Sequence, residues 1–517
     1  MSLLKIYNLN YSIGEKSLYN DCSFVLNHKE HLGVVGKNGV GKSTLIKIIT
    51  NQISPDTAEI EVDQNIKIGY LDQYAQINQD LTILQYLQTA FSYLYDTEKK
   101  MIEAYEKSAE DYQYFEKAVA FQNILESNNF YNIEVIIEKI ANGLGISAIG
   151  LNKKIISLSG GQRAKVILAK LLLEKPDLLL LDEPTNFLDK EHVDWLTQYL
   201  QEFEKAFILI SHNTEFLNKV TTHIVEINNN KFLKFSGNYN SYLKQKTLMV
   251  DDYEKRYEKQ QKQIEKAEDF IRRNIAGSNS KNARGRRKQL ERMEKLPPPS
   301  KQKPKPVFSF KQLHCSIQQK LIINNLTIGY KNLPLIENIN LTISGGEKVI
   351  IKGFNGIGKT TLIKTILKII PPINGSFEFS ETIKPIYYQQ DIIWENKLTT
   401  PLDIIKQNYP ELNEKESRSL LAKYGLSQKD VMQQISTLSG GEQAKVKFCL
   451  LTNKPTNFLI LDEPTNHLDV QAKDSLKETL KKFEGTILLV CHEEEFYKDI
   501  ATKVIDLYLI QILRSRR

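Results

Sequence analysis

The sequence predicts an α/β fold in which two copies of one phosphate-loop domain follow each other and are joined by an α-helical hairpin. Three observations support this. The 517 residues are enough for two or three domains of about 150 residues each. One set of glycine-rich and acidic motifs occurs twice, and the region between the copies has a charged helical pattern. With 41% hydrophobic and 25% charged residues, collagen-like, mucin-like and wholly disordered proteins are excluded.

Three motifs recur in the same order. GKNGVGKST at 36–44 returns as GFNGIGKTT at 353–361, LSGGQ at 158–162 as LSGGE at 438–442, and LLLLDEPTNFLD at 178–189 as FLILDEPTNHLD at 458–469. The offset is 317 from Lys42 to Lys359 but 280 from Asp182 to Asp462, so the first copy holds 37 more residues between these landmarks.

We therefore divide the chain into a first domain at 1–244, a linker at 245–306 and a second domain at 307–517. The extra residues of the first domain lie at about 91–131, a stretch without proline or glycine whose apolar and charged residues recur at roughly helical spacing. This predicts a projecting helical arm. The second domain lacks the turn and Gly-Asn-Tyr segment that follow residue 223 in the first copy, so we expect a shortened C-terminus, through divergence or truncation.

The linker is expected to be two antiparallel helices around a polar tip. Its Lys/Glu-rich pattern breaks at 276–282, resumes, and stops at three prolines, 297–299. Residues 272–305 contain 12 Lys or Arg and 2 Asp or Glu, a net charge of +10, whereas the whole chain carries +7 and the remainder therefore −3. The positive charge is thus concentrated in the linker.

Cysteine use and hydropathy indicate a cytoplasmic chain. Cys22, Cys315, Cys449 and Cys491 are scattered without metal-ligand spacing and read as reduced thiols. No apolar run approaches about 18 residues, and the start lacks a signal-peptide pattern. We expect no membrane domain.

Each glycine-rich segment follows a short apolar run and precedes a helical one, the strand-to-helix context of a phosphate loop. Backbone N–H groups of such a loop surround phosphates, the lysine adds charge, and Ser43 or Thr360 offers a hydroxyl to Mg²⁺. A single such loop could be a chance glycine turn, but two copies make that improbable. The predicted residues are Gly36, Asn38, Gly39, Gly41, Lys42, Ser43 and Thr44, and Gly353, Asn355, Gly356, Gly358, Lys359, Thr360 and Thr361.

Acidic pairs end two continuously apolar runs, 178–181 and 458–461, which are typical of buried parallel strands. Asp182 and Asp462 are predicted to bind Mg²⁺, and Glu183 and Glu463 to polarise the attacking water. One such pair would equally suit a solvated strand end, but the duplication favours catalysis.

The Ser-Gly-Gly segments precede helical runs, so each offers backbone N–H groups and a hydroxyl to a second phosphate contact. The residues are Ser159, Gly160 and Gly161, and Ser439, Gly440 and Gly441.

In this order the motifs resemble those of an ATP-binding cassette domain, present twice and covering nearly the whole chain. The resemblance implies an Mg²⁺-dependent ATPase whose cassettes pair head to tail within one monomer, so that the LSGG segment of each caps the ATP of the other. By motif match, Gln73 and Gln390 resemble the glutamines that contact Mg²⁺ and the attacking water. His212 and His492 resemble the histidine that senses the γ-phosphate. Asp189 and Asp469 match the loop after the acidic strand, which communicates between the two ATP sites. Tyr11 and Tyr330 match the adenine-stacking position, although an ordinary strand tyrosine suits it nearly as well.

The cassettes depart from the family pattern after the histidine. Asn213-Thr214 and Glu493-Glu494 stand where Asp-Arg is usual, and Cys491 replaces Ser. These changes bear on hydrolysis rate more than on ATP binding.

Two cassettes in one chain, joined by a basic helical linker, are similar to the ABC-F family of translation factors. The resemblance implies binding to rRNA and tRNA on the exit-site side of the ribosome. It also implies either a housekeeping role or protection against antibiotics at the peptidyl-transferase centre, which the residues do not decide. The predicted RNA-binding residues are Lys281, Arg284, Arg286, Arg287 and Lys288. The alternatives are a transporter ATPase subunit, which leaves the linker unexplained, and a DNA-associated cassette ATPase, which would usually carry long coiled coils or zinc motifs.

Overall fold

The computed structural model describes residues 2–14, 16–37, 39–63, 66–71, 80–108, 111–274, 280–298, 305–330, 333–354, 356–389, 394–466 and 468–507. Of the predicted site residues, Asn38, Gln73, Asn355 and Gln390 lie outside these ranges, as does the terminal segment 508–517.

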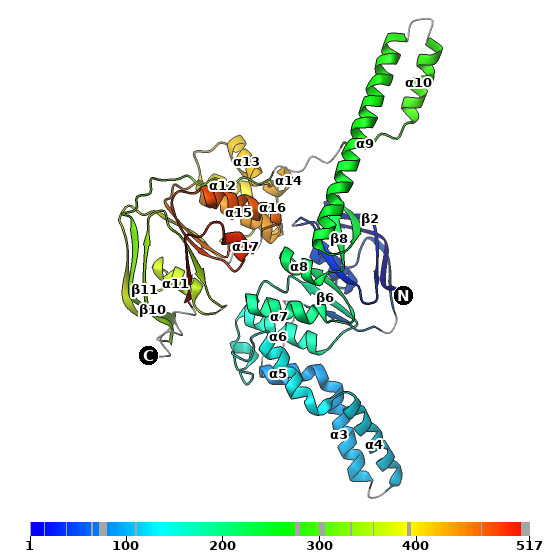
Figure 1. Ribbon diagram of the computed structural model, residues 1–517, viewed down its shortest axis with the longest axis vertical. Helices are drawn as coiled ribbons and strands as arrows, with labels where there is room; N and C mark the ends of the chain where they lie inside the picture. Colours follow the sequence, from blue (N-terminus) through cyan, green and yellow to red (C-terminus); the bar gives the residue numbers. More distant parts are fainter. Residues whose placement is uncertain are drawn as a thin grey trace.

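Each cassette combines a three-stranded antiparallel sheet with a larger, mainly parallel one (Figure 1). In the first cassette the antiparallel order is β2 (Lys16–Asn27), β1 (Ser2–Ile13), β4 (Thr57–Val62). The second sheet runs β5 (Ile68–Tyr70), β6 (Leu178–Asp182), β7 (Ala206–Ile210), β3 (His31–Val35), β8 (His223–Asn228), β9 (Lys231–Ser236).

The second cassette repeats this plan. Its antiparallel order is β11 (Leu333–Ser344), β10 (Lys320–Tyr330), β13 (Asn374–Phe379). The parallel order is β14 (Pro385–Tyr388), β15 (Phe458–Asp462), β16 (Thr486–Val490), β12 (Lys348–Lys352), β17 (Lys503–Asp506). The prediction of two tandem α/β cassettes is confirmed.

Helices cover both faces of the parallel sheets. In the first cassette they are α1 (Lys42–Ile49), α2 (Ile83–Gln88), α5 (Ile133–Gly143), α6 (Gly160–Leu173), α7 (Lys190–Gln201) and α8 (Thr214–Val220). In the second they are α11 (Lys359–Ile366), α12 (Pro401–Asn408), α13 (Glu414–Lys423), α14 (Gln428–Met432), α15 (Gly440–Thr452), α16 (Val470–Lys482) and α17 (Glu494–Tyr497).

Burial on both faces explains why the strands that carry the acidic pairs are apolar throughout. Leu178 and Leu180 point into the core shared with the antiparallel sheet, whereas Leu179 and Leu181 point into the core beneath the helices. Successive side chains of a strand face opposite sides, so a strand covered twice needs apolar residues at every position.

A helical arm extends from the first cassette (Figure 1). It consists of α3 (Ser92–Lys107) and α4 (Tyr112–Ser127). Leu94, Ala104, Ala118 and Leu125 are buried, whereas most of the arm's other side chains are at least partly exposed. The arm stands away from the sheets, at the opposite end of the cassette from the linker hairpin.

The linker forms the second projection, made of α9 (Tyr239–Asn274) and α10 (Ser280–Arg292). The first helix begins at Tyr239, before the predicted linker start at 245. The Asn238 side chain accepts a hydrogen bond from the backbone N–H of Ser241 (3.1 Å), as an N-cap does. Tyr242 is buried against Phe235, with ring centroids 5.1 Å apart. The first turn of α9 therefore packs on the first cassette.

The described helices include none that is long and apolar enough to span a bilayer.

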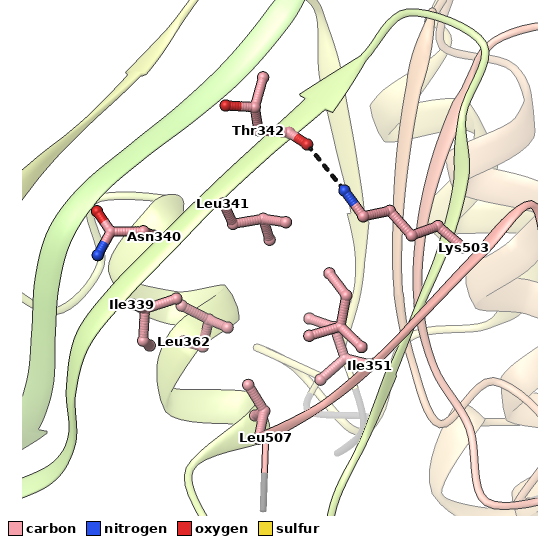
Figure 2. A pocket seen from close by; sticks show the side chains of 9 residues that line it. Ile339, Asn340, Leu341, Thr342, Ile351, Leu362, Lys503 and Leu507 are labelled. Carbon is pink, nitrogen blue, oxygen red and sulfur yellow. Dashed lines mark hydrogen bonds between the residues drawn. The ribbon is translucent and has the colours of Figure 1, made fainter. Parts of the chain in front are cut away.

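An apolar cavity of about 260 Å³ separates β11 from β17 in the second cassette (Figure 2). In the first cassette β9 pairs with β8, and Phe232 contacts Tyr19 and Phe24 of the antiparallel sheet at centroid distances of 5.3 and 5.7 Å. The cavity is lined mainly by aliphatic side chains from β11, β12, α11, β17 and the residue after it, without the converging polar groups of a nucleotide site.

Candidate active sites

The two phosphate loops lie where the sequence predicts them, between β3 and α1 and between β12 and α11. Gly41 and Gly358 precede the helices with φ of 104° and 115°, a conformation that side chains disfavour. A Cβ atom on Gly41 would also lie 2.6 Å from the Tyr19 hydroxyl. Glycine is therefore required where the first loop enters its helix.

The lysines of both loops are buried and bonded to loop carbonyls. Lys42 Nζ donates to the oxygens of Gly36 (2.9 Å) and Lys37 (3.1 Å). Lys359 Nζ makes the same contacts with Gly353 (2.8 Å) and Phe354 (3.1 Å). Burial lowers the pKa of both lysines, and nearby carboxylates oppose this shift. Each ammonium thus lies within its loop, as a phosphate-binding lysine should.

The acidic pairs lie at the carboxyl ends of β6 and β15. Parallel pairing places Asp182 opposite Ile210 and Asp462 opposite Val490, so the strand that leads to each histidine runs alongside. Glu183 and Glu463 have φ of 49° and 48°, an uncommon conformation outside glycine. Such strain persists where the surroundings enforce it and often marks functional residues.

Each glutamate contacts the predicted histidine of its own cassette. Glu183 Oε1 lies 3.5 Å from His212 Nε2, and Glu463 Oε1 lies 3.2 Å from His492 Nε2. Burial and the neighbouring Asp182 raise the pKa of Glu183 to about 7. Burial also disfavours the charged form of Glu463, but the close contact with His492 and other polar contacts outweigh it and lower the pKa. The two catalytic centres therefore differ electrostatically.

The residues around the aspartates fit Mg²⁺. The Ser43 hydroxyl bonds the Asp182 carboxylate, and Thr360 lies close enough to Asp462 to favour its charged form. Burial nevertheless raises the pKa of both aspartates, that of Asp462 to about 6. Among the described residues, neither Asp462 carboxylate oxygen has a hydrogen bond of normal geometry, although both are buried. A buried carboxylate beside a hydroxyl is the oxygen donor set that Mg²⁺ prefers.

The signature serines cap their helices. Ser159 Oγ accepts from the backbone N–H of Gln162 (3.3 Å) at the start of α6, and Ser439 accepts from Glu442 (3.4 Å) at the start of α15. Ser439 Oγ also donates to Glu442 Oε2 (2.8 Å), a charged contact that the glutamine of the first copy cannot make. Gly160, Gly161 and Gly440 continue these turns, with Gly441 buried. Both helix starts have the conformation expected of an anion contact.

The two tyrosines lie in equivalent strands but make different contacts. Tyr330 ends β10, is 51% exposed and accepts a hydrogen bond from Thr361 of the phosphate loop (3.3 Å). Tyr11 lies in β1 beside Tyr19, with ring centroids 6.4 Å apart, and the Tyr19 hydroxyl donates to Gly41. Tyr330 therefore adjoins its loop directly, whereas Tyr11 does so through Tyr19.

The cassettes act on each other electrostatically. Asp469 of the second cassette is among the carboxylates that favour the charged form of Lys42, and Asp189 of the first cassette does the same for Lys359. Lys190 and Glu494 form an ion pair between the cassettes at 2.9 Å. The aspartate after each acidic strand therefore lies within electrostatic range of the lysine in the opposite phosphate loop.

The structure adds residues that the motif analysis did not single out. Asn466 donates to Glu463 Oε2 (2.7 Å), whereas in the described first cassette its counterpart Asn186 makes no such side-chain bond to Glu183. The asparagine that ends the motif DEPTN in both copies was the sequence feature from which this contact could have been suspected. Lys165 and Lys445, on the signature helices, lie 3.5 and 3.4 Å from Asp189 and Asp469.

The five predicted RNA-binding residues lie on α10, and all are exposed. Two of them have partners within the hairpin: Arg286 stacks over the Phe270 ring at 3.9 Å, and Arg287 pairs with Glu291 at 3.0 Å. Lys281, Arg284 and Lys288 complete the set.

Duplicated phosphate loops, each beside an acid-ended strand and a histidine, define an ATP-binding cassette ATPase with both cassettes in one chain. A family model described as ABC transporter matches residues 19–186 and 336–466, and a second with the same description matches 225–310. Among curated relatives, the uncharacterized ABC transporter ATP-binding protein YfmM of Bacillus subtilis is 43% identical over 509 residues, covering 97% of this chain and 98% of the relative. ABC transporter F family member 5 of Arabidopsis thaliana is 32% identical, over 97% of this chain and 74% of the relative. The energy-dependent translational throttle protein EttA of Escherichia coli is 33% identical, over 92% of this chain and 86% of the relative.

The fold also matches a crystal structure of the archaeal ribosome recycling factor aABCE1 with the stalk protein aP1, at a TM-score of 0.58 and 18% identity. That match covers 96% of this chain and 87% of the other. The chain belongs to the ABC-F family of tandem ATP-binding cassette ATPases. It binds and hydrolyses ATP and is related to a translation factor.

Proposed function

We propose that this protein binds the ribosome on the tRNA exit-site side and uses ATP binding and hydrolysis to act on translation. The basic linker hairpin carries this proposal. Its exposed cations lie on a projection joined to two ATP-hydrolysing cassettes, in a chain related to EttA, which is named a translational throttle. A phosphate-rich partner is the expected ligand for such a surface.

The hairpin is built to present these cations at a defined place. The Tyr253 hydroxyl donates to Pro297 O (2.7 Å), and Gln260 Nε2 donates to Glu294 O (2.9 Å), so the chain after α10 is bonded along α9. Ala283 and Ile264 are buried, at 1% and 8% exposure. The basic residues therefore lie on ordered helix rather than on a loose tether.

The cassettes would act as an ATP-gated clamp. Mg²⁺, when bound, would neutralise phosphate charge, and we assign it to Ser43, Asp182 and Gln73 in the first cassette and to Thr360, Asp462 and Gln390 in the second. Lys42 and Lys359 would bind the phosphates, while Glu183 and Glu463 orient water. Closing the head-to-tail interface would move the linker between them.

Neutralising the basic face should weaken ribosome binding and reduce its salt dependence. The test changes Lys281, Arg284, Arg286, Arg287 and Lys288 to glutamine in a hydrolysis-deficient chain and measures ribosome pelleting across a salt series. Each lost phosphate contact removes about 0.7–0.9 from the slope of log K against log salt. Because Arg286 and Arg287 have internal partners, changing only the other three should account for most of the effect, lowering the slope by about 2 to 3.

A matched control changes Lys255, Lys259 and Lys262, which are exposed on α9 outside the strongly basic segment. Binding should then change little. Unchanged binding and slope in the five-residue variant would move recognition to the arm at 91–131. Preferential pelleting of the parent chain with membranes or duplex DNA would instead support the transporter or DNA-associated alternative.

We further propose that the protein protects the ribosome against antibiotics bound at the peptidyl-transferase centre. Producing the chain in a susceptible bacterium should raise the inhibitory concentration of a phenicol or oxazolidinone. The five-residue linker variant, at equal protein level, should lose this effect. Unchanged susceptibility with confirmed ribosome binding would favour a housekeeping translation factor.

A further inference from the structure

An ion pair between Lys190 and Glu494 connects segments that flank the second ATP site. Lys190 Nζ donates to Glu494 Oε2 at 2.9 Å, although the residues are 304 positions apart. Lys190 is the first residue of α7 and follows Asp189, whereas Glu494 is the first residue of α17 and lies two positions after His492. The pair therefore spans the cassette interface.

The Lys190–Glu494 pair lies beside the second ATP site, which contains Lys359, and not beside the first. Asp189, next to Lys190, favours the charged form of Lys359 in the opposite phosphate loop. His492, close to Glu494 in the chain, contacts Glu463 at 3.2 Å. One partner thus adjoins the loop that faces the second site, and the other adjoins the histidine within it.

The first site cannot form the same pair. At the offset of 280, Lys190 corresponds to Val470 and Glu494 to Thr214. Neither of these side chains carries a charge. Glu494, the second residue after His492, therefore supports an ion pair between the cassettes that its counterpart after His212 cannot form.

A second contact positions the same segment from within its own cassette. Lys473 on α16 pairs with Glu493 at 2.7 Å, and the corresponding residues of the first cassette are Val193 and Asn213. Asn213 instead caps α8 by accepting from the Phe216 backbone N–H at 3.0 Å. The segment after His492 is thus held by charge from both cassettes, whereas its counterpart is held by a helix cap.

We propose that Lys190 is a positioning residue for ATP hydrolysis at the second site, because its pair with Glu494 holds the segment after His492 against the first cassette. Because only the second site has this pair, the two sites differ in how their histidine segments are held. The position of His492 then depends on contact between the two cassettes. It acts in the ATPase cycle independently of ribosome binding, although it rests on the roles proposed for Glu183 and Glu463.

The test uses the full chain without ribosomes and reports on one site at a time. Glu183→Gln leaves the second site to be measured, and Glu463→Gln leaves the first. In the Glu183→Gln background, Lys190→Glu should lower kcat about three- to five-fold at low salt with little change in KM, the size expected when an exposed pair is replaced by like charges. Glu494→Lys should do the same, and the two together should restore the rate.

The Glu463→Gln background provides the decisive comparison, because the same changes should leave its turnover unaltered. All chains are also measured with both glutamates intact, so that the loss and its rescue do not depend on a half-blocked enzyme. Raising the salt should shrink the difference between Lys190→Glu and its parent. The control reverses Arg256 and Asp252, an exposed pair 2.8 Å apart within α9, and should have no effect.

Three outcomes would overturn the proposal: no loss with Lys190→Glu, an equal loss at both sites, or a loss that the charge swap does not rescue. Failure of the glutamate assignment is distinguishable, because Glu183→Gln or Glu463→Gln would then leave turnover unchanged by itself.

Discussion

Replacing Glu183 and Glu463 together with glutamine is expected to abolish steady-state ATP hydrolysis while preserving ATP binding. Each glutamate directly follows the aspartate that ends its strand and has an unusual backbone conformation, with a positive φ. Each also contacts the histidine of its own cassette. Glutamine keeps the size but cannot accept a proton from water or polarise it as a carboxylate does. Loss of a positioned base typically costs at least about 100-fold in rate.

Phosphate release measures the turnover, and a fluorescent nucleotide measures the binding. The control changes Glu202 and Glu484 to glutamine, which removes one exposed carboxylate from each cassette away from the sites. Undiminished hydrolysis in the Glu183→Gln, Glu463→Gln chain would show that other groups orient the water.

Pairs of substitutions should reveal that each ATP site is built from both cassettes. Lys42 and Ser439 are predicted to serve one site, and Lys359 and Ser159 the other. Lys42→Ala with Ser439→Arg should therefore be no worse than Lys42→Ala alone, because both changes disable the same site. Lys42→Ala with Ser159→Arg disables both sites and should lower the remaining turnover by about 100-fold more, the usual cost of losing a transition-state contact.

Charges that act across the interface favour this pairing of loops and signature serines. Asp469 favours the charged form of Lys42, and Asp189 favours that of Lys359, so each phosphate loop lies within electrostatic range of the opposite cassette. If Ser439→Arg lowered the turnover of the Lys42→Ala chain more than Ser159→Arg did, each site would lie within a single cassette. A control Ser157→Arg, on the exposed turn before the signature, should leave turnover near that of the parent.

Much of the fold and of the nucleotide sites could be predicted from local patterns. The apolar runs before Asp182 and Asp462 indicated buried parallel strands, and the glycine segments before Lys42 and Lys359 indicated strand-to-helix turns; both features are present. The α/β class, the tandem cassettes, the family and the ATPase activity are confirmed. The RNA contacts and the individual catalytic roles stay predictions.

Other features depended on contacts between distant segments. The start of α9 at Tyr239 is set by a cap at Asn238 and by packing on Phe235, which a charged helical pattern does not show. Arg286 was predicted only as an RNA-binding residue, and the stacking of its guanidinium over the Phe270 ring at 3.9 Å depends on the two helices of the hairpin packing together.

The repeated motifs, the strand and helix types around them and the concentration of positive charge in the linker can be predicted from the order of the amino acids, because they follow from neighbouring residues and their spacing. Which side chains meet depends on how the folded segments pack. Packing places Lys190 against Glu494, 304 residues away, and gives Glu463 an asparagine partner, whereas Glu183 lies beside Asp182. The two copies share their motifs, and they differ where residues outside those motifs, such as Lys190 and Glu494, meet across long distances in the chain.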